Sequence, residues 1–383
     1  MNEDGSDRFP GPIILARPMP PSSPLRRLGG PLLLVAASLL LTGLALETAF
    51  RLAGVSVGTV QINRGTVRRT PNPRLRFELR PSARVRAEVE YRTSAAGMRN
   101  PEVAETKPAG RRRVAVLGDS IAFGYWVAEE QAFPRQLEAM LGGPGRVEVL
   151  DFGVPGYNLE QEIETLRTKA LAFSPDVVVV AFCLNDLEGL FSYEYGLTLD
   201  RAARGETLAG RLLEGLLARS VLLSWVEYRL AELDARRRFV QARNPLSGPF
   251  YEQAVEQQSR ALRGHFAVLA SLLRPRGMTG LVAVFPTFGN HFSAYPHRDL
   301  HRAVSGAARE AGLRAVDLLD CYQAYDFRDV RVDVVHPNPL GHRIAAHAIR
   351  DALCADGLAA CPEPSPPACT EYRKADFPAV RGY

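Results

Sequence analysis

The chain has 383 residues, of which 46% are hydrophobic and 23% are charged, and these proportions exclude wholesale disorder, collagen and a simple coiled coil. Its 47 basic and 42 acidic residues give a net charge of +5, but residues 51–113 alone carry +10 and residues 114–383 sum to about −5. No basic motif with interleaved aromatic residues accompanies the arginines, so we do not expect a nucleic-acid partner.

The first predicted element is an uncharged run of 19 residues from Leu28 to Leu46. As a helix with a rise of about 1.5 Å per residue it spans roughly 28 Å, which suffices to cross the hydrocarbon core of a membrane. Arg26 and Arg27 directly precede the run, whereas Arg51 is the first basic residue after it. This bias favours a cytoplasmic N-terminus and an exported body.

We therefore predict a cytoplasmic segment at 1–27 and an uncleaved transmembrane signal anchor at 28–48, through which the protein contacts the membrane. A long proline-rich lead before the run favours the anchor. Two alternatives stay open. A cleaved signal peptide would use Gly43 and Ala45 as the small residues before the cut, and a buried core helix would have the same composition.

Residues 49–110 are predicted to form a basic stalk that ends in a short β unit. Residues 75–79 and 85–91 alternate apolar and polar side chains, as half-buried strands do. The stalk is either a solvated spacer or a segment that attracts anionic lipid or acidic polysaccharide.

From residue 111 the pattern changes to strands that alternate with helices. Continuous apolar strands separated by helices indicate a parallel sheet covered on both faces. The predicted fold class is α/β, a flavodoxin-like three-layer sandwich with a mostly parallel five-stranded sheet in a domain at 111–353. The expected strands are 114–117, 147–150, 177–182, 281–285 and 313–316, and the expected helices are 130–141, 159–172, 297–312 and 339–353.

A helical insertion is expected at 187–279, because 208–243 and 251–273 both have helical apolar spacing. It either packs on the core or caps the active-site end of the sheet. The tail at 354–383 is rich in Cys and Pro, and we expect it to lie extended on the surface or to be disordered.

The five cysteines fit an oxidising compartment. Cys183 lies in an apolar run and is expected to be an inert buried thiol, whereas the other four, at positions 321, 354, 361 and 369, suffice for two disulfides whose pairing the sequence does not give. No C-x-x-C spacing is present, which disfavours zinc.

Four short motifs follow predicted strands or precede the last helix. Each is weak alone, but all four fall where the carboxyl ends of parallel strands place ligand-binding groups. The motifs are Gly118-Asp119-Ser120, Asp151-Phe152-Gly153, Cys183-Leu184-Asn185 and Asp333-Val334-Val335-His336.

In this order of Ser, Gly, Asn and Asp-His, the sequence resembles the SGNH (GDSL) hydrolase family over about 111–353. The predicted anchor, the basic stalk and the run from Gly153 to Asn158 are similar to membrane-tethered bacterial members. Two positions depart from the family pattern. Ile121 replaces the usual Leu after the Ser, and Cys183 replaces the Gly two residues before the Asn.

The resemblance implies a catalytic triad of Ser120, Asp333 and His336 that works without metal or cofactor. His336 would take the proton of Ser120, and Asp333 would orient the imidazole. The oxyanion hole would consist of the backbone N–H groups of Ser120 and Gly153 and the side-chain amide of Asn185.

The expected function is ester hydrolysis through an acyl-serine intermediate. The expected substrates are O-acyl, chiefly acetyl, groups on envelope or exported glycans, and the expected place is the bacterial inner membrane, crossed once, with the catalytic domain periplasmic or extracellular. Alternatives are an O-acyltransferase, a lipase or lysophospholipase acting on a lipid ester, and an inactive glycan-binding or assembly component. Neither the oligomeric state nor the alcohol of the substrate follows from the sequence.

The remaining histidines are expected to be structural. His297 and His301 are spaced i, i+4 on a predicted helix, but without the further ligands of a zinc protease we expect surface residues. His342 is expected to have a packing role.

Overall fold

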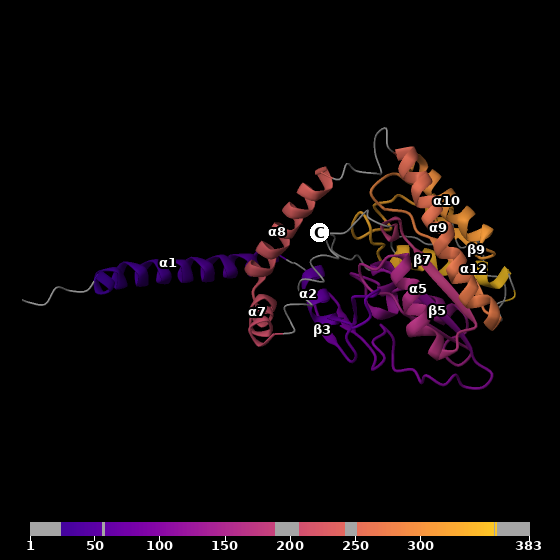
Figure 1. Cartoon of the computed structure of the whole chain (residues 1–383), viewed down its shortest axis with the longest axis horizontal. Coiled ribbons are helices and arrows are strands. Elements are labelled where there is room, and N and C mark those ends of the chain that lie inside the picture. The colour runs from indigo at the N-terminus through magenta and orange to yellow at the C-terminus, as the bar shows by residue number, and fades with distance from the viewer. Residues whose placement is uncertain (1–23, 56–57, 188–206, 242–250, 356, 358–383) are drawn as a thin grey trace, which may run out of the picture. The chain divides into compact units, whose positions relative to one another are not determined.

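The computed structural model describes residues 24–55, 58–187, 207–241, 251–355 and 357 (Figure 1). The chain divides into two compact units, the first ending at Val55 and the second beginning at Ser56. The segments predicted at 1–27 and 354–383 therefore lie almost entirely outside the described residues.

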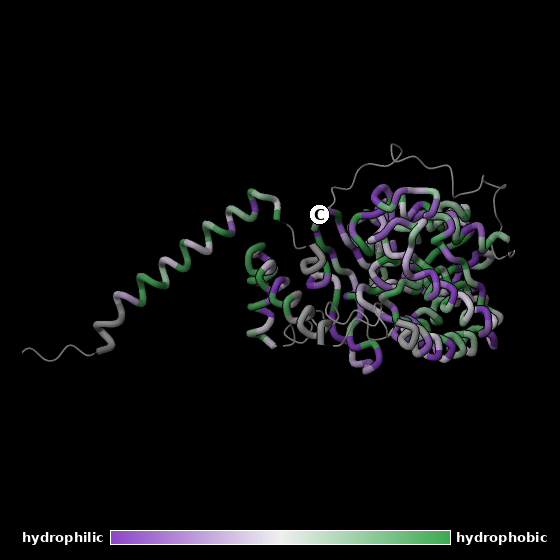
Figure 2. Tube along the Cα trace, turned by 90° about the horizontal axis from the view of Figure 1, so that it is seen from above, coloured by the Kyte–Doolittle hydropathy of each residue, from purple (hydrophilic) through white to green (hydrophobic). Residues whose placement is uncertain are grey.

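The described part of the first unit contains one long helix, α1 (Pro24–Leu52). Its stretch Gly30–Leu52 has a mean hydropathy of 2.0 and is long and apolar enough to cross a membrane, as its green colour in Figure 2 illustrates. A signal sequence near the N-terminus has the same length and composition, so the helix fits a membrane anchor and a signal sequence equally.

The second unit is built on a five-stranded sheet in which every pair is parallel. The central strands are runs of Val, Ala and Leu that are buried on both faces, as in other parallel sheets, whereas the edge strand at 314–317 is only half-buried. The spatial order of the five strands is β6-β5-β7-β8-β9, which is the 2-1-3-4-5 order of flavodoxin-like folds. The predicted fold class is therefore confirmed. The strands are β5 (Arg112–Gly118), β6 (Val147–Asp151), β7 (Val177–Phe182), β8 (Thr279–Val284) and β9 (Arg314–Asp317).

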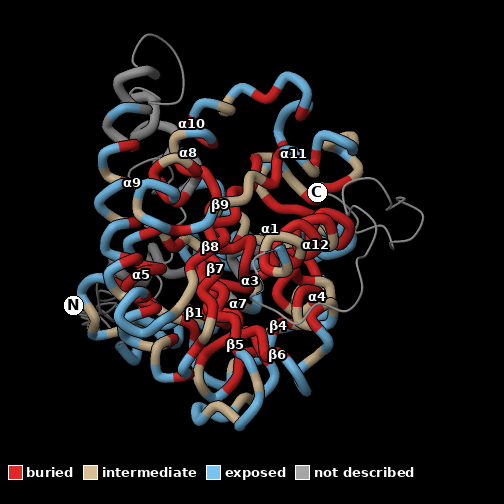
Figure 3. The backbone as a smooth tube through the Cα atoms, turned by 90° about the vertical axis from the view of Figure 1, so that its right-hand side faces the viewer, coloured by how far each residue is buried: buried red, intermediate tan, exposed pale blue. Residues whose placement is uncertain are grey.

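Helices cover both faces of the sheet. On one face α4 (Phe133–Met140) packs against α12 (Pro339–Ala355), and on the other α9 (Tyr251–Leu273) packs against α5 (Leu159–Thr168) and α10 (Arg298–Glu310), as Figure 3 shows with the buried strands between the two layers. The shorter elements are α3 (Ser120–Phe123), α11 (Leu319–Tyr322), η1 (Glu129–Gln131), η2 (Ala170–Phe173), η3 (Leu184–Asp186), η4 (Arg274–Arg276) and η5 (Phe292–Ala294).

The segment predicted to be a stalk begins with a helix and two small hairpins. The predicted strand 85–91 is divided into two strands, because a tight turn forms in which the Ala87 N–H donates to the Val89 carbonyl at 3.0 Å. The elements are α2 (Gly58–Thr66), the antiparallel pair β1 (Val67–Arg69) and β2 (Phe77–Leu79), and the antiparallel pair β3 (Arg84–Arg86) and β4 (Glu90–Arg92).

This N-terminal segment packs on the α/β domain instead of standing free as a spacer. It buries Phe77 and Tyr91 in one apolar cluster with Phe123, Tyr125 and other side chains of the domain. The arginines of β3 and β4 remain exposed. Because side chains alternate between the two faces of a strand, the apolar side chains pack on the domain and the charged ones face the solvent. The segment predicted as a stalk is thus part of the folded body.

The insertion contains α7 (Leu208–Arg219), α8 (Val221–Gln241) and α9. The single helix predicted at 208–243 is interrupted, because Ser220 has an extended backbone (φ −106°, ψ 118°) and its hydroxyl accepts the Leu223 N–H at 3.0 Å. Helix α9 buries Phe266 in the core, whereas α7 and α8 make their main described contacts with each other and with α2.

The described cysteines agree with the sequence expectation for them. Cys183 is a free, buried thiol, and Cys321 and Cys354 are disulfide-bonded. Cys361 and Cys369 lie outside the described residues.

One histidine prediction is wrong. His301 is buried, with Nδ1 2.8 Å from an Asp317 carboxylate oxygen and Nε2 3.2 Å from the Tyr295 hydroxyl. Asp317 lies at the end of β9, so the spacing of residues along α10 alone could not show that His301 has this buried partner. His297 is half-buried at the start of the same helix.

Candidate active site

The predicted catalytic side chains meet at the carboxyl end of the sheet. His336 Nε2 lies 2.8 Å from Ser120 Oγ, and His336 Nδ1 lies 2.8 Å from Asp333 Oδ2. Ser120 follows β5, whose neighbours β6 and β7 are reached by connections that run in opposite directions, and such a switch point is where open α/β sheets bind ligands. Ser120 and His336 are buried, with 5% and 7% of their surfaces exposed.

The Asp333 carboxylate is held by the loop that carries His336. Its Oδ1 accepts the backbone N–H groups of Val335 and His336, each at 2.8 Å. Burial raises the pKa of Asp333, but the charge of His336 and these hydrogen bonds outweigh burial and lower the pKa to about 2. Asp333 is therefore ionised at neutral pH and can stabilise a protonated imidazole.

The nucleophile stands on a tight turn between β5 and the short helix α3. Asp119 caps α3, since its Oδ1 accepts the Ile121 N–H at 2.8 Å. Gly118 allows the turn to approach β7 closely, because a Cβ there would lie 2.7 Å from the Ala122 Cβ and 3.1 Å from the Ala181 Cβ. The turn therefore depends on the absence of a side chain at Gly118.

The far end of α3 is held by a residue that sequence reasoning missed. Arg99, from the N-terminal segment, is 1% exposed and donates to the carbonyl oxygens of Phe123, Gly124 and Val127, the last at 2.7 Å. Its guanidinium also lies over the Tyr91 ring, 4.5 Å from the centroid. Arg99 lies in none of the four motifs, and nothing in the sequence indicates that it contacts the turn that carries Ser120.

Tyr125 connects the N-terminal segment to the catalytic base. Its ring centroid lies 5.4 Å from that of His336, and its hydroxyl donates to Asn63 Oδ1 in α2. The Tyr91 hydroxyl accepts the Trp126 N–H at 2.8 Å one residue further on. The first helix and the hairpins of the second unit therefore pack directly behind the triad.

Gly153 lies in the loop after β6, where its N–H donates to Asp151 Oδ1 at 2.8 Å. Burial raises the pKa of Asp151 to about 8, although this hydrogen bond opposes the shift. Gly153 is also required for packing, because a Cβ there would lie 2.5 Å from the Phe123 N. The N–H of Gly156, in the same loop with φ +82°, has no acceptor among the described residues.

Asn185 lies in η3, directly after β7, but its side chain is outside the described part of the structure. The neighbouring Asp186 accepts the Cys183 N–H at 2.6 Å. Asp186 and Glu162 of α5 are both buried, and burial, reinforced by the charge of the nearby Asp119, raises the pKa of each well above its ordinary value. The carboxyl groups of Glu162 and Asp186 therefore lie close to the nucleophile turn that carries Asp119.

His342 has the packing role expected of it. It is buried, and its Nδ1 accepts the Phe133 N–H at 3.3 Å. Burial lowers the pKa of His342 to about 3, with help from the charges of Arg99 and His336. The ring is therefore neutral, and among the described residues no group of three or more His, Cys, Asp or Glu side chains is arranged to hold a metal.

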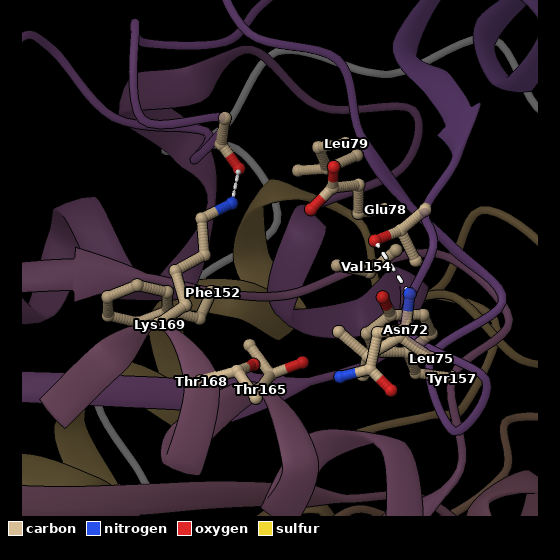
Figure 4. A pocket seen from close by; sticks show the side chains of 12 residues that line it. Asn72, Leu75, Glu78, Leu79, Phe152, Val154, Tyr157, Thr165, Thr168 and Lys169 are labelled. Carbon is tan, nitrogen blue, oxygen red and sulfur yellow. Dashed lines mark hydrogen bonds between the residues drawn. The ribbon is translucent and has the colours of Figure 1, made fainter.

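A cavity of about 310 Å³ lies behind the loop after β6, between the β1–β2 hairpin and α5 (Figure 4). None of the triad residues lines it. Lys169 points across it and donates to the Gly97 carbonyl at 3.1 Å. The lining residues are Thr70, Asn72, Leu75, Glu78, Leu79, Gly97, Phe152, Val154, Tyr157, Thr165, Thr168 and Lys169.

A flavodoxin-like sheet with a Ser-His-Asp constellation at its carboxyl edge defines an α/β serine hydrolase. Residues 116–344 match the model of the GDSL-like lipase/acylhydrolase family, and the chain belongs to this family. It is accordingly a hydrolase of ester bonds. The match confirms the resemblance expected from the four motifs.

Several solved structures are similar to the chain at low identity. LAE5, described as an α/β hydrolase enzyme from the metagenome of Lake Arreo, Spain, is 15% identical, with 66% of this chain and 97% of that one covered and a TM-score of 0.41. An acetyl xylan esterase, AlAXEase, is 15% identical over 63% and 99% of the two chains, with a TM-score of 0.39. TesA is 13% identical over 63% and 98%, with a TM-score of 0.39. Curated protein sequences give no match.

Proposed function

We propose that the chain is a membrane-tethered serine esterase that removes O-acyl groups, chiefly acetyl, from envelope or exported glycans. The observation that carries the proposal is the unbroken hydrogen-bond relay from Ser120 through His336 to Asp333, each link 2.8 Å long. This relay is what a serine hydroxyl requires to act as a nucleophile.

In the proposed mechanism His336 Nε2 accepts the Ser120 proton while Ser120 Oγ attacks the ester carbonyl. The tetrahedral intermediate collapses when His336 returns the proton to the leaving alcohol oxygen, which leaves an acyl-Ser120 ester. Water then attacks this ester, again losing a proton to His336, and the carboxylic acid is released. Asp333 stabilises the imidazolium in both halves of the reaction.

The oxyanion requires hydrogen-bond donors at the same edge of the sheet. The Ser120 N–H has no acceptor among the described residues, and the Asn185 amide is the proposed side-chain donor. The backbone donor proposed for the intervening loop is the Gly153 N–H, since Gly153 packs directly against Phe123 of α3. In this structure that N–H donates to Asp151 Oδ1, so it would have to leave this carboxylate to bind the oxyanion.

Export is supported by two features of the chain. Helix α1 has the length and composition of a membrane anchor, and Cys321 and Cys354 are disulfide-bonded, as cysteines are in oxidising compartments. The low exposure of Ser120 and His336 favours a compact acyl group such as acetyl over a long chain. An acetylated glycan outside the cytoplasm fits both the exported location and the compact acyl group.

The second candidate is an O-acyltransferase, since the triad of Ser120, His336 and Asp333 would form the same acyl-serine in that reaction. In that case a sugar hydroxyl would take the acyl group from Ser120. The two reactions share every residue of the triad and differ only in the acceptor.

The test uses the full chain in lipid nanodiscs with p-nitrophenyl acetate, butyrate and octanoate, with and without an oligosaccharide acceptor. We expect release from the acetyl ester and a loss of more than about 10³-fold in kcat/KM for Ser120→Ala. Ser271→Ala, which changes an exposed serine on α9, is the matched control and should leave activity unchanged.

The outcomes separate the candidates. Transfer of acetyl to the sugar would favour the acyltransferase, and a preference for octanoate would favour a lipase. If the wild type and Ser120→Ala were both folded and equally inactive, the catalytic proposal would be refuted and an inactive glycan-binding role would replace it.

A further inference from the structure

The insertion carries an exposed apolar surface that the hydrolytic function does not use. On α7, Leu208, Leu212 and Leu216 follow one another every four residues, which places them on one side of the helix. The eight exposed apolar residues of the two helices leave 39–68% of their surfaces accessible, and such contiguous patches mark interaction sites. We call them the leucine face: Leu208, Leu212, Leu213 and Leu216 of α7, and Leu223, Val226, Leu230 and Leu233 of α8.

The polar side of the same two helices is held by a single residue of α2. Arg64 donates to Glu214 at 2.7 Å, to Glu227 at 2.8 Å and to the Ser224 hydroxyl at 3.2 Å. Glu214 lies two residues after Leu212, about 200° further around α7, and therefore on the opposite side. On α7 the side bound to α2 therefore lies opposite the exposed leucines. On α8, Glu227 lies four residues after Leu223 and three before Leu230, so the side bound to Arg64 there flanks the exposed leucines.

Helix α2 lies a short stretch of chain from the proposed membrane anchor. Helix α1 ends at Leu52 and α2 begins at Gly58, so residues 53–57 form the whole connection. Even fully extended, five residues span no more than about 18 Å. Whatever α2 holds, including the leucine face, is therefore confined near the surface of the bilayer that α1 would cross.

The charge next to α2 suits the same surface. The β3–β4 hairpin contacts α2, and there Arg84, Arg86 and Arg92 share one carboxylate, that of Glu90. The turn of the same hairpin adds the exposed Glu88, so the hairpin has a net charge of +1, which anionic headgroups attract. Leucines beside arginines on short helices are the composition of segments that lie in a membrane interface.

We propose that the leucine face of α7–α8 lies in the interface of the lipid bilayer and forms a second membrane contact of the catalytic body. The inference rests on the proposed anchoring by α1. The insertion would then fix the orientation of the body on the membrane through a second contact in addition to α1.

The test measures membrane depth at single sites in the full chain in vesicles of phosphatidylcholine and phosphatidylglycerol. Leu216→Cys and Leu230→Cys are labelled with a nitroxide, since Cys183, the free thiol of the described chain, is buried. Val268→Cys on α9, 40% exposed, is the matched control. Leu40→Cys reports on α1, and hydrolysis of an acetyl ester shows that each labelled protein is folded.

We expect collisions of the spin label with oxygen, relative to those with a water-soluble nickel complex, to be several-fold more frequent at positions 216 and 230 than at 268. If position 40 showed membrane depth and positions 216 and 230 matched 268, the inference would be overturned while the anchor stood. Aqueous exposure at position 40 would instead overturn the anchor. Protection of 216 and 230 from both reagents, with spin–spin coupling between chains, would assign the face to a second copy and also overturn the proposal.

Discussion

Arg99 gives the sharpest test of how the N-terminal segment supports catalysis. Its guanidinium contacts the stacked rings of Tyr91 and Phe123 and donates to three backbone carbonyl groups at and after the end of α3. The other end of α3 begins with Ser120. Removing the guanidinium should therefore destabilise the body and displace the nucleophile together.

The magnitude follows from the contacts. Each buried carbonyl left without a donor costs about 1–3 kcal/mol, and a desolvated cation–π contact contributes about 2 kcal/mol. Part of this loss is offset, because the cost of burying the charge disappears as well. We expect Arg99→Ala to lower the free energy of unfolding by about 4 kcal/mol, within the range for broken buried networks.

The activity of Arg99→Ala should fall by more than the fraction of unfolded protein accounts for. A displacement of about 1 Å at a catalytic group costs about 10²-fold in rate, so kcat/KM on an acetyl ester should fall by about that factor under conditions where the variant is folded. Arg99→Lys should be intermediate, since one ammonium cannot reach three carbonyl groups in the geometry of a guanidinium.

The assay combines urea unfolding with ester hydrolysis on the full chain in nanodiscs. Arg92→Ala is the matched control from the same segment, since Arg92 is 57% exposed and its ion pair with Glu90 should contribute less than about 1 kcal/mol. If Arg99→Ala changed stability by no more than Arg92→Ala and kept its activity, the support of the nucleophile by the N-terminal segment would be refuted.

Three further predictions concern buried charge. Neither carboxylate oxygen of Glu162 has a partner among the described residues, and because its pKa is raised, the free energy of unfolding should fall as pH rises above about 4.3. Glu162→Gln should therefore raise the free energy of unfolding at pH 8 by about 1–3 kcal/mol. An unchanged dependence of stability on pH in urea titrations would contradict this. The pKa of Asp333 is lowered to about 2, so its contribution to stability is complete above about pH 4 and is lost as pH falls towards 2; acid unfolding of Asp333→Asn should lack this component, and identical acid profiles would argue against the ion pair. Arg64→Met leaves Glu214 and Glu227 without their shared cation, so hydrogen exchange should accelerate in α7 and α8 but not in β7, and adding Glu214→Gln and Glu227→Gln should restore protection; equal exchange in all forms would show that Arg64 does not hold the insertion.

The sheet and the triad were predictable because their signals are local. An uninterrupted run such as Val177–Phe182 has few alternatives to a buried parallel strand, and a motif directly after such a strand must lie at the carboxyl edge. Ser120 and the Asp333–His336 pair could therefore be brought together without knowing any distance between them. The order of the motifs then indicated the family.

The supports of the site were not predictable, because they depend on contacts between distant segments. Nothing near Arg99 in the sequence indicates that it will bind the end of α3. Arginine is mostly exposed in folded proteins, so an exposed fraction of only 1% could not be expected from the residue type. The acceptor of the Gly153 N–H was missed for a related reason. The sequence places Asp151 directly after a strand, but it does not show that its carboxylate turns back to accept the N–H two residues later.

Residues 58–110 are packed against the catalytic domain, so they cannot act as a solvated spacer before the active site. A solvated spacer would let the catalytic body rotate freely, and events at the membrane would then have no effect on Ser120. In the structure the same segment holds α3 through Arg99 and the insertion through Arg64, with Tyr125 lying between α2 and His336. Phe123 and Tyr125 lie in one apolar cluster with Ile62 of α2 and Tyr91 of β4. The support behind Ser120 and the proposed membrane contact of α7–α8 therefore depend on the same N-terminal segment of the second unit.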